Sequence, residues 1–455
     1  MLLRPPQDGL EGVPADGALI ARMPVYGTRD AGRGLWKKIR ARFKDHGMKE
    51  NRIMSALFSI SNEKNDIVCM LGTHVDDILW AADDESQKII DRVLAEFDIR
   101  EIKEGNFRYC GLDIVQDENS TVNVSAKDNI EKIEAISYPG DSQLTRKCNE
   151  GEVSQLRSVV GAVSWVSRQC KPELLYRVSR LQTVVNHAKV FHLKEANKVL
   201  EDAVQSADIG LVFKGGAVKW DNDMIVLTIT DASWSGEQAV VRGSLEPLRS
   251  QKARFNGLSG SGFIDGDSDN VHPICLTRNV IRRVCKSTLQ AETLACLWGV
   301  ESGVRIRAAI ADARGLLGQD RKIRPDWEEV SAMTMRHLWM TDCKSLEEHL
   351  TASTLGKVED KRLSIDLCSL RQDIWTNGEE ELEILHPSKF CDKIRWIDTS
   401  IMAVDCLTKA MPTDFLVNIL QTSLYDVTPD PDSTMKKVKK QLARAKTPTE
   451  TPKGK

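Results

Sequence analysis

Hydrophobic residues along the chain recur with two different periods, and the period changes from one stretch to the next. Short apolar runs bounded by polar residues predict strands at residues 67–71, 78–82 and 224–231. Apolar residues spaced three and four apart predict a helix at 84–97, which Asp83 or Asp84 would cap, and three helices within 151–206. The chain is therefore expected to mix sheets and helices in more than one domain.

Two adjacent acids, Asp76 and Asp77, separate the first two of these apolar runs. The simplest geometry is a tight hairpin with both aspartates at its tip. Neighbouring residues of a strand point to opposite faces, so two adjacent carboxylates can approach one ion only at a turn. They repel one another, and a divalent cation would relieve that repulsion. Taken alone, the pair could equally be an ordinary Asp-Asp turn.

Composition limits the classes of protein that the chain can represent. Its 455 residues carry a formal net charge of −3, so nucleic-acid binding would need local basic clusters. The 11 cysteines are scattered without a Cys-x-x-Cys pair, which argues against zinc or a disulfide framework and fits a reducing compartment. No apolar run is long enough for a membrane span, and the start is no signal peptide. We expect an intracellular protein of the cytoplasm or nucleus, not a secreted one.

Basic residues gather in three places. Residues 35–46 read as a basic helix that either contacts phosphates or is a solvated face. A second cluster precedes Glu292, where it could grip the phosphates of a hybrid duplex or be solvated surface. Its members are Arg278, Arg282, Arg283 and Lys286. Residues 428–455 are rich in Pro and Lys and are expected to be disordered, with a weak, salt-sensitive attraction to nucleic acid.

The surroundings of the paired aspartates resemble the reverse transcriptase of copia-type retrotransposons. Residues 71–80 resemble the palm hairpin of that family, with His74 at its aromatic position, and 24–31 and 107–114 resemble its flanking segments in the same order. The resemblance implies a palm over 1–125 and a helical thumb or connection over 126–215. It also implies that the first polymerase aspartate lies upstream of Met1, so the palm is expected to be N-terminally truncated and to have lost RNA-directed DNA polymerase activity.

Four more acids follow in the order strand, helix, strand, helix: Asp231, Glu292, Asp342 and Asp405. This is the order of type 1 ribonuclease H, and the short sequence segments around each acid resemble those of the copia versions of that domain. The resemblance implies an α/β ribonuclease H-like domain over 222–412, with a mixed central sheet and flanking helices. The whole chain would then be an α+β palm fragment and helical thumb followed by this domain.

The residue types suit metal-dependent phosphodiester cleavage. Two divalent ions can clamp the attacking water and the leaving oxygen, and Mg²⁺ prefers hard carboxylate ligands. We expect Asp231, Glu292, Asp342 and Asp405 to be catalytic ligands of Mg²⁺ or Mn²⁺. The resemblance gives Asp76 and Asp77 the same role in the palm.

Some assignments stay open at this stage. Asp398 lies near Asp405 and is the alternative fourth ligand, although it falls where the family has other residues. His386 could be a mobile catalytic histidine or an ordinary strand-end residue. The polar, Gly-rich stretch 256–270 is expected to be a loop that holds extra length, and residues 311–337 are expected to be inserted or irregular.

Together these features predict a fragment of a copia-type retrotransposon Pol polyprotein, a protein class associated with DNA integration. Its expected activity is metal-dependent cleavage of the RNA strand of an RNA–DNA hybrid, so its expected partners are that hybrid, an RNA template and DNA. The competing interpretation is a decayed or co-opted relic that binds nucleic acid without cleaving it. A metal titration followed by a hybrid cleavage assay separates the two.

Overall fold

The computed structural model describes residues 31–140, 143–220, 223–237, 249–318, 322–375 and 392–428, and short pieces before residue 31. The chain divides into two compact units. Unit 1 comprises residues 1–103 and 308–330, and unit 2 comprises 104–307 and 331–455. The first two strands, β1 (Leu2–Leu3) and β2 (Leu19–Ile20), pair with one another. In the described part of the chain, no helix has both the length and the apolarity that crossing a bilayer requires.

Unit 1 is built on a four-stranded antiparallel sheet in the order β3-β4-β5-β6. Its strands are β3 (Lys49–Glu50), β4 (Leu57–Ser61), β5 (Ile67–His74) and β6 (Asp77–Ala82). Helices α1 (Ala31–Asp45) and α2 (Asp84–Leu94) contribute their apolar faces to a shared core with the sheet. The Asp83 side chain accepts a hydrogen bond from the backbone of Ser86 and so caps α2, as one of the two predicted candidates.

A segment from much later in the chain completes unit 1. Asp312 is fully buried and receives the Arg52 side chain and its backbone N–H, the latter at 2.7 Å. The Asn51 amide donates to the carbonyl of Ala309 at 2.7 Å. A buried carboxylate is stable only when it is paired and hydrogen-bonded, so this segment is an integral part of the unit. Residues 311–337 were predicted to be inserted or irregular; the end of α8, all of α9 and the first residue of β14 are regular, and the described backbone between α8 and α9 is irregular.

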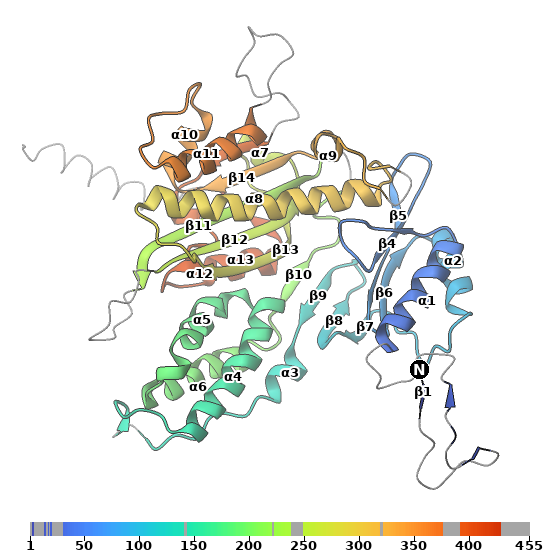
Figure 1. Ribbon diagram of the computed structural model, residues 1–455, viewed down its shortest axis with the longest axis horizontal. Coiled ribbons are helices and arrows are strands. Elements are labelled where there is room, and N and C mark those ends of the chain that lie inside the picture. Colours follow the sequence, from blue (N-terminus) through green and yellow to red (C-terminus); the bar gives the residue numbers. More distant parts are fainter. Residues whose placement is uncertain are drawn as a thin grey trace, which may run out of the picture. The chain divides into compact units, whose positions relative to one another are not determined.

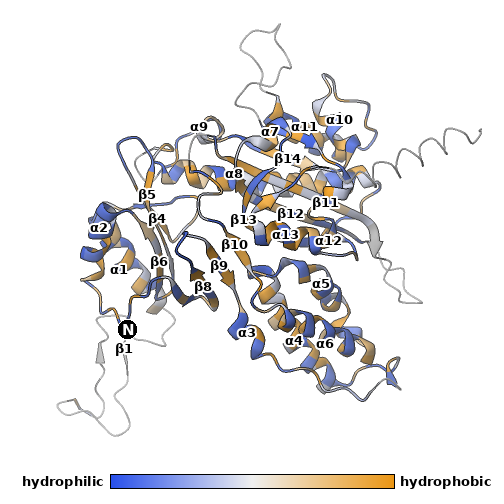
Figure 2. Ribbon diagram, turned by 180° about the vertical axis from the view of Figure 1, so that it is seen from behind, coloured by the Kyte–Doolittle hydropathy of each residue, from blue (hydrophilic) through white to orange (hydrophobic). Residues whose placement is uncertain are grey.

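Unit 2 begins with a second antiparallel sheet in the order β10-β9-β8-β7. Its strands are β7 (Asn106–Tyr109), β8 (Leu112–Gln116), β9 (Val122–Ser125) and β10 (Leu211–Phe213). A helical bundle follows β9, and its apolar stripes form one core. The helices are α3 (Lys127–Glu131), α4 (Glu150–Gln169), η2 (Pro172–Leu174), α5 (Leu175–Val184), η3 (Val185–His187) and α6 (Val190–Gln205). Figure 2 shows both hydrophilic and hydrophobic colour along α4 and α6, as expected of amphipathic helices.

The rest of unit 2 surrounds a six-stranded mixed sheet in the order β15-β14-β11-β12-β13-β16. Its strands are β11 (Ile225–Glu237), β12 (Arg249–Ser259), β13 (Asp269–Val280), β14 (His337–Thr341), β15 (Lys393–Trp396) and β16 (Leu424–Tyr425). Strands β11, β14 and β15 run parallel, and β12 and β13 are antiparallel to their neighbours. Both the sheet and its helices agree with the expected mixed α/β class.

Helices cover both faces of this sheet (Figure 1). Helix α8 (Thr288–Ala313) crosses one face, with α9 (Trp327–Thr334) following it in the chain. Helices α10 (Lys344–Thr351) and α11 (Lys361–Ile374) share a core with residues of α8. The opposite face packs against α12 (Asp405–Thr408) and α13 (Asp414–Thr422). The short elements α7 (Gly262–Asp265) and η4 (Thr399–Ile401) lie in connections.

A buried polar network lies between α8 and the sheet. His337 is fully buried, and its Nε2 lies 2.7 Å from Thr228 Oγ1 while its Nδ1 lies 3.2 Å from Asp392. Arg307 of α8 donates to the other oxygen of Asp392. Each of these buried groups has a hydrogen-bond partner, which is the condition for a polar network to stabilise a core. The arrangement resembles a hydroxyl–imidazole–carboxylate triad, but its burial gives it a structural role.

The structure also corrects the expectation for residues 256–270 and leaves other expectations untested. Residues 256–270 are not one long loop, because they include the end of β12, all of α7 and the start of β13. Gly257 lies in a paired strand, whereas Gly260, Gly262 and Gly266 lie in and beside α7, between the two strands. His386 and the tail beyond residue 428 lie outside the described residues. The division into palm, thumb and ribonuclease H remains a prediction.

Candidate active site

Three acids meet beside two interior strands of the six-stranded sheet, at the end of β14 and next to β11. Asp231 lies within β11, and Asp342 is the first residue after the parallel neighbour β14. Ile229 pairs with Met340, so Asp231 and Asp342 occupy the next positions of the same register and face the same side. Glu292 extends toward the same two residues from the second turn of α8. The register of two strands and the start of one helix therefore bring the acids together.

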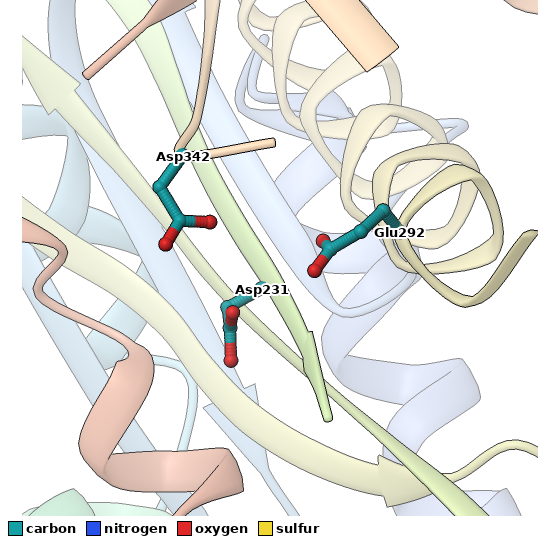
Figure 3. A group of neighbouring side chains, drawn as sticks. All are labelled: Asp231, Glu292 and Asp342. Carbon is teal, nitrogen blue, oxygen red and sulfur yellow. The ribbon is translucent and has the colours of Figure 1, made fainter. Parts of the chain in front are cut away.

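Oxygen atoms of Asp231, Glu292 and Asp342 all lie within 4.8 Å of one another. Figure 3 shows the three carboxyl groups directed toward a common space between β11, the end of β14 and α8. Asp231 and Glu292 are buried and Asp342 is half-buried. The structure thus brings three of the predicted ligands into one group.

Burial and mutual repulsion make ionisation of these acids costly. Burial, followed by the charge of Asp405, raises the pKa of Asp231 from 3.8 to about 8. Burial and then the charge of Asp231 raise the pKa of Glu292 well above its usual value. The pKa of Asp342 is raised by burial and by Asp405. All three carboxyl groups can therefore ionise together at low cost only when a cation binds among them.

The donor set fits a hard divalent cation. Among the described residues, Glu292 Oε2 is buried and has no hydrogen-bond partner. Such an oxygen is costly unless something outside the chain contacts it. Carboxylate oxygens are the ligands that Mg²⁺ and Mn²⁺ prefer. The three acids therefore could hold one or two such ions.

Asp405 is joined to this group through a lysine. It begins α12 and is 4% exposed, and its Oδ1 accepts a hydrogen bond from Lys409 at 2.6 Å. Lys409 also lies 3.4 Å from Asp231 Oδ1, and the Thr408 hydroxyl donates to Asp231 Oδ2. Burial works against the charge on Lys409, yet the facing carboxylates outweigh it and raise the pKa of the ammonium. Lys409 therefore balances part of the negative charge of the site.

Asp398, the alternative fourth ligand, serves another purpose. Its carboxylate accepts hydrogen bonds from the backbone and the hydroxyl of Ser400, at 2.9 and 2.7 Å, and it caps η4. A capping carboxylate is committed to a helix end. The geometry favours Asp405.

The hairpin of unit 1 places Asp76 and Asp77 on the surface. Val75 and Asp76 form the turn, and Asp77 begins β6 paired with His74. Val75 is 65% exposed and has a φ of 56°, a conformation that is strained for a β-branched residue. In the part of the chain that the structure describes, no third potential ligand completes a metal-binding group around these acids.

The predicted basic cluster is divided. Arg278 lies buried in β13, with its guanidinium over the ring of Tyr176. Arg283 pairs with Asp366 of α11, and Lys286 lies 3.2 Å from Asp360. Arg282 is exposed. The four residues thus do not form a single phosphate-binding surface.

Several residues near the acids had no predicted role. Lys409 lies in the same family-like sequence segment as Asp405. Its spacing of four residues from Asp405 was the sequence feature that could have predicted their pairing. Trp234 and Trp396 are 45% and 40% exposed. Their Nε1 groups donate to the carbonyls of Cys285 and Asp342, at 2.9 and 3.0 Å, so both rings are held near the acids. Nothing in their local sequence distinguished them from core tryptophans.

Comparison with known proteins finds one relationship in sequence. The chain is 26% identical over 164 residues to the protein named "Putative transposon Ty5-1 protein" from Saccharomyces cerevisiae. The match covers 32% of this chain and 52% of the relative, so it spans about half of that protein. No family model matches the chain.

Solved structures were compared as well. Ribonuclease H1 of the archaeon Halobacterium salinarum aligns with 42% of the chain and 98% of its own length, at 14% identity and a TM-score of 0.21. A foamy viral protease-reverse transcriptase in complex with double-stranded DNA aligns with 82% of the chain and 60% of its own length, at 10% identity and a TM-score of 0.20. The sequence match relates this chain to a transposon protein.

Proposed function

We propose that this chain, a homologue of a Ty5-type retrotransposon protein, is a Pol fragment whose ribonuclease H-like part cleaves the RNA strand of an RNA–DNA hybrid. The observation that carries the proposal is the group of three largely buried carboxylates within 4.8 Å of one another. Asp231, Glu292 and Asp342 would hold Mg²⁺ or Mn²⁺, with Asp405 as the fourth acid. Strand order and donor chemistry both support this assignment.

Asp231, Glu292 and Asp342 would hold the ions, which would supply an activated water and stabilisation of the leaving oxygen. The residues of the chain do the remaining work. Sheet register holds Asp231 and Asp342 side by side, and α8 presents Glu292 to them. Thr408 orients one oxygen of Asp231 through a hydrogen bond. Lys409 offsets repulsion among the acids until a cation arrives.

The exposed hairpin supports a separate proposal for unit 1. Asp76 and Asp77 would be acids of a polymerase palm, with Asp76 in the turn and Asp77 at the first position of β6 directly after it. The described residues supply no third acid there, which favours a polymerase-inactive unit that contacts nucleic acid. In the non-enzymatic alternative, the whole chain binds nucleic acid without cleaving it.

A cleavage assay tests the enzymatic proposal. The purified 455-residue chain is mixed with Mg²⁺ or Mn²⁺ and a hybrid whose RNA strand is end-labelled. Cleavage of the RNA in the hybrid is expected, with the same RNA in a duplex with RNA left intact. The Glu292→Gln variant is the matched control, because it preserves size but removes the charge. Metal binding without cleavage by the wild-type chain would favour the nucleic-acid-binding relic instead.

A further inference from the structure

The Lys409 side chain lies between two acids of the candidate active site. Its Nζ is 2.6 Å from Asp405 Oδ1 and 3.4 Å from Asp231 Oδ1. Among the described residues, the acids whose oxygens all lie within 4.8 Å of one another are Asp231, Glu292 and Asp342, and Asp405 is not part of that group. Asp231 therefore faces two positions that suit a cation, one within the group and one that the Lys409 ammonium occupies.

The position of the ammonium has the chemistry of a cation site. The side chains of Asp231 and Asp405 are 1% and 5% exposed, so a cation between them replaces the water that both carboxylates have lost. The Thr408 hydroxyl donates to Asp231 Oδ2, which leaves Oδ1 to face the ammonium. Mg²⁺ would bind the same oxygens at about 2.0 to 2.1 Å. The ammonium and the metal ion cannot both lie there, because like charges so close repel strongly.

Lys409 can leave this position while its backbone stays in place. Its N–H donates to the carbonyl of Asp405 at 2.9 Å, which fixes the main chain at the end of α12. Its side chain is 40% exposed and has a flexible stem of four carbons. The ammonium can therefore move into solvent when a divalent cation takes its place, without disrupting the fold.

We propose that Lys409 takes the place of a second divalent cation, so that the resting site binds one ion among Asp231, Glu292 and Asp342. The inference rests on the proposed function for the identity of the ion, Mg²⁺ or Mn²⁺. A second ion binds between Asp231 and Asp405 only by displacing the ammonium, which lowers its apparent affinity. Lys409 thereby sets the metal concentration at which the site holds two ions.

Counting bound Mn²⁺ tests this inference in the absence of nucleic acid. Electron paramagnetic resonance of the full chain gives the number of bound ions, and two Mn²⁺ about 4 Å apart that share the Asp231 carboxylate give an exchange-coupled spectrum. At about ten times the Kd of the first ion, the wild-type chain should bind one ion with an uncoupled spectrum. Lys409→Met keeps a long unbranched side chain without the charge, and should bind two ions with a coupled spectrum.

Two matched variants separate the charge of Lys409 from its packing. Lys409→Arg keeps the positive charge and should still bind a single ion at that concentration. Lys198→Met removes a charge from an exposed position on α6, in the same unit, and should behave as the wild-type chain does. Circular dichroism checks that each variant is folded.

A further comparison keeps the test decisive if Lys409→Met does not fold. In the wild-type chain, the coupled spectrum should appear only at higher Mn²⁺ concentrations, as the metal displaces the ammonium. Asp405→Asn removes a ligand of the second position, so the coupled spectrum should disappear while the first ion still binds.

Two ions bound with similar affinity by the wild-type chain, or one ion bound by folded Lys409→Met, would overturn the inference. Two ions bound by Lys409→Arg at the lower concentration would also overturn it, because the charge would then have no effect. A change from one ion to two in a chain that cleaves no hybrid would retain the inference while the proposed function fails. Absence of bound Mn²⁺ from every folded protein would overturn the metal site and both proposals with it.

Discussion

Single residues decide what the candidate active site can do, because Asp231 and Glu292 are buried, Asp342 is half-buried, and the three acids face one another. Asp231, Glu292 and Asp342 were predicted because the segments around them, in their order, resemble those of ribonuclease H; alone, each acid could have been a cap or a turn residue. Lys409 was not predicted, because its importance depends on the Asp231 carboxylate, which is far away in sequence. Local sequence patterns thus predict candidate metal ligands better than they predict the charged residues that offset the charge of those ligands.

Replacing Asp342 with Asn should separate folding from metal binding. The amide has almost the same shape but is a poor ligand for a hard cation, and it removes one repelling charge. For the wild-type chain, Mg²⁺ or Mn²⁺ at 100 times its Kd should add about 2.7 kcal/mol to the free energy of unfolding of unit 2. The variant should keep its circular dichroism spectrum and gain almost nothing from the metal. Thermal denaturation with and without metal measures both, and an equal gain in both proteins would contradict the assignment.

The raised pKa of Asp231 predicts how stability depends on pH. Its pKa is about 8 in the folded chain against 3.8 ordinarily, so between these values the folded state holds a proton that the unfolded state has lost. Without metal, the free energy of unfolding should therefore fall as pH rises from about 4 to about 8. Mg²⁺ should reduce that fall, because the cation replaces the proton.

Denaturant titrations at about pH 5.5 and about pH 8 measure this effect. Asp231→Asn removes the titrating group and should flatten the dependence, whereas Asp223→Asn changes an acid of the same unit outside the site. A metal-free wild-type chain that becomes more stable toward pH 8 would show that Asp231 ionises freely.

At the scale of elements, two glycines let α8 approach the sheet. A Cβ at Gly299 would lie 2.4 Å from Thr230 Cγ2, and one at Gly303 would lie 2.3 Å from His337 Nε2. Their spacing of four residues puts both on one side of the helix. This spacing and a strand at residues 224–231 were both visible in the sequence, but the close packing of the helix against that strand was not. Elements with a strong period were predictable, whereas β12 and β13 contain polar and glycine positions that make sense only against their neighbours.

Gly303→Ala should destabilise unit 2 by about 1 to 3 kcal/mol, because the added methyl group meets the buried His337 network. Gly161→Ala provides the matched control, since nothing lies within 4 Å of its added Cβ in the interior of α4. There the change should stabilise by about 0.5 to 1 kcal/mol through helix propensity. Urea denaturation of both variants measures the difference. Equal effects of the two substitutions would mean that α8 does not need its close approach.

For the whole molecule, the sequence predicted a mixed α/β class and retrotransposon relationship, but not how distant segments combine. The helices 84–97 and 151–206 were predictable because each carries its own apolar stripe. The role of residues 308–330 in unit 1 was not, because Asp312 reads as an ordinary helix residue until Arg52 is placed beside it. Such long-range pairing leaves no periodic signal.

The chain assayed by itself should not extend a primer. Asp76 and Asp77 are exposed, and the described residues offer no third acid to bridge two ions with them. Extension of a labelled primer on an RNA template, compared with a variant carrying both Asp76→Asn and Asp77→Asn, measures this. Any extension above that of the double variant would show that a working polymerase site exists.

The late segment that completes unit 1 also sets the timing of its folding. Residues 31–103 leave the ribosome about 200 residues before Ala308, whose segment carries the partner of Arg52. At about 5 to 20 residues per second, the first part of unit 1 waits on the order of 10 to 40 s for its last piece. During that interval unit 1 lacks part of its core, so a nascent chain stalled before residue 308 should be open to protease there and to chaperones.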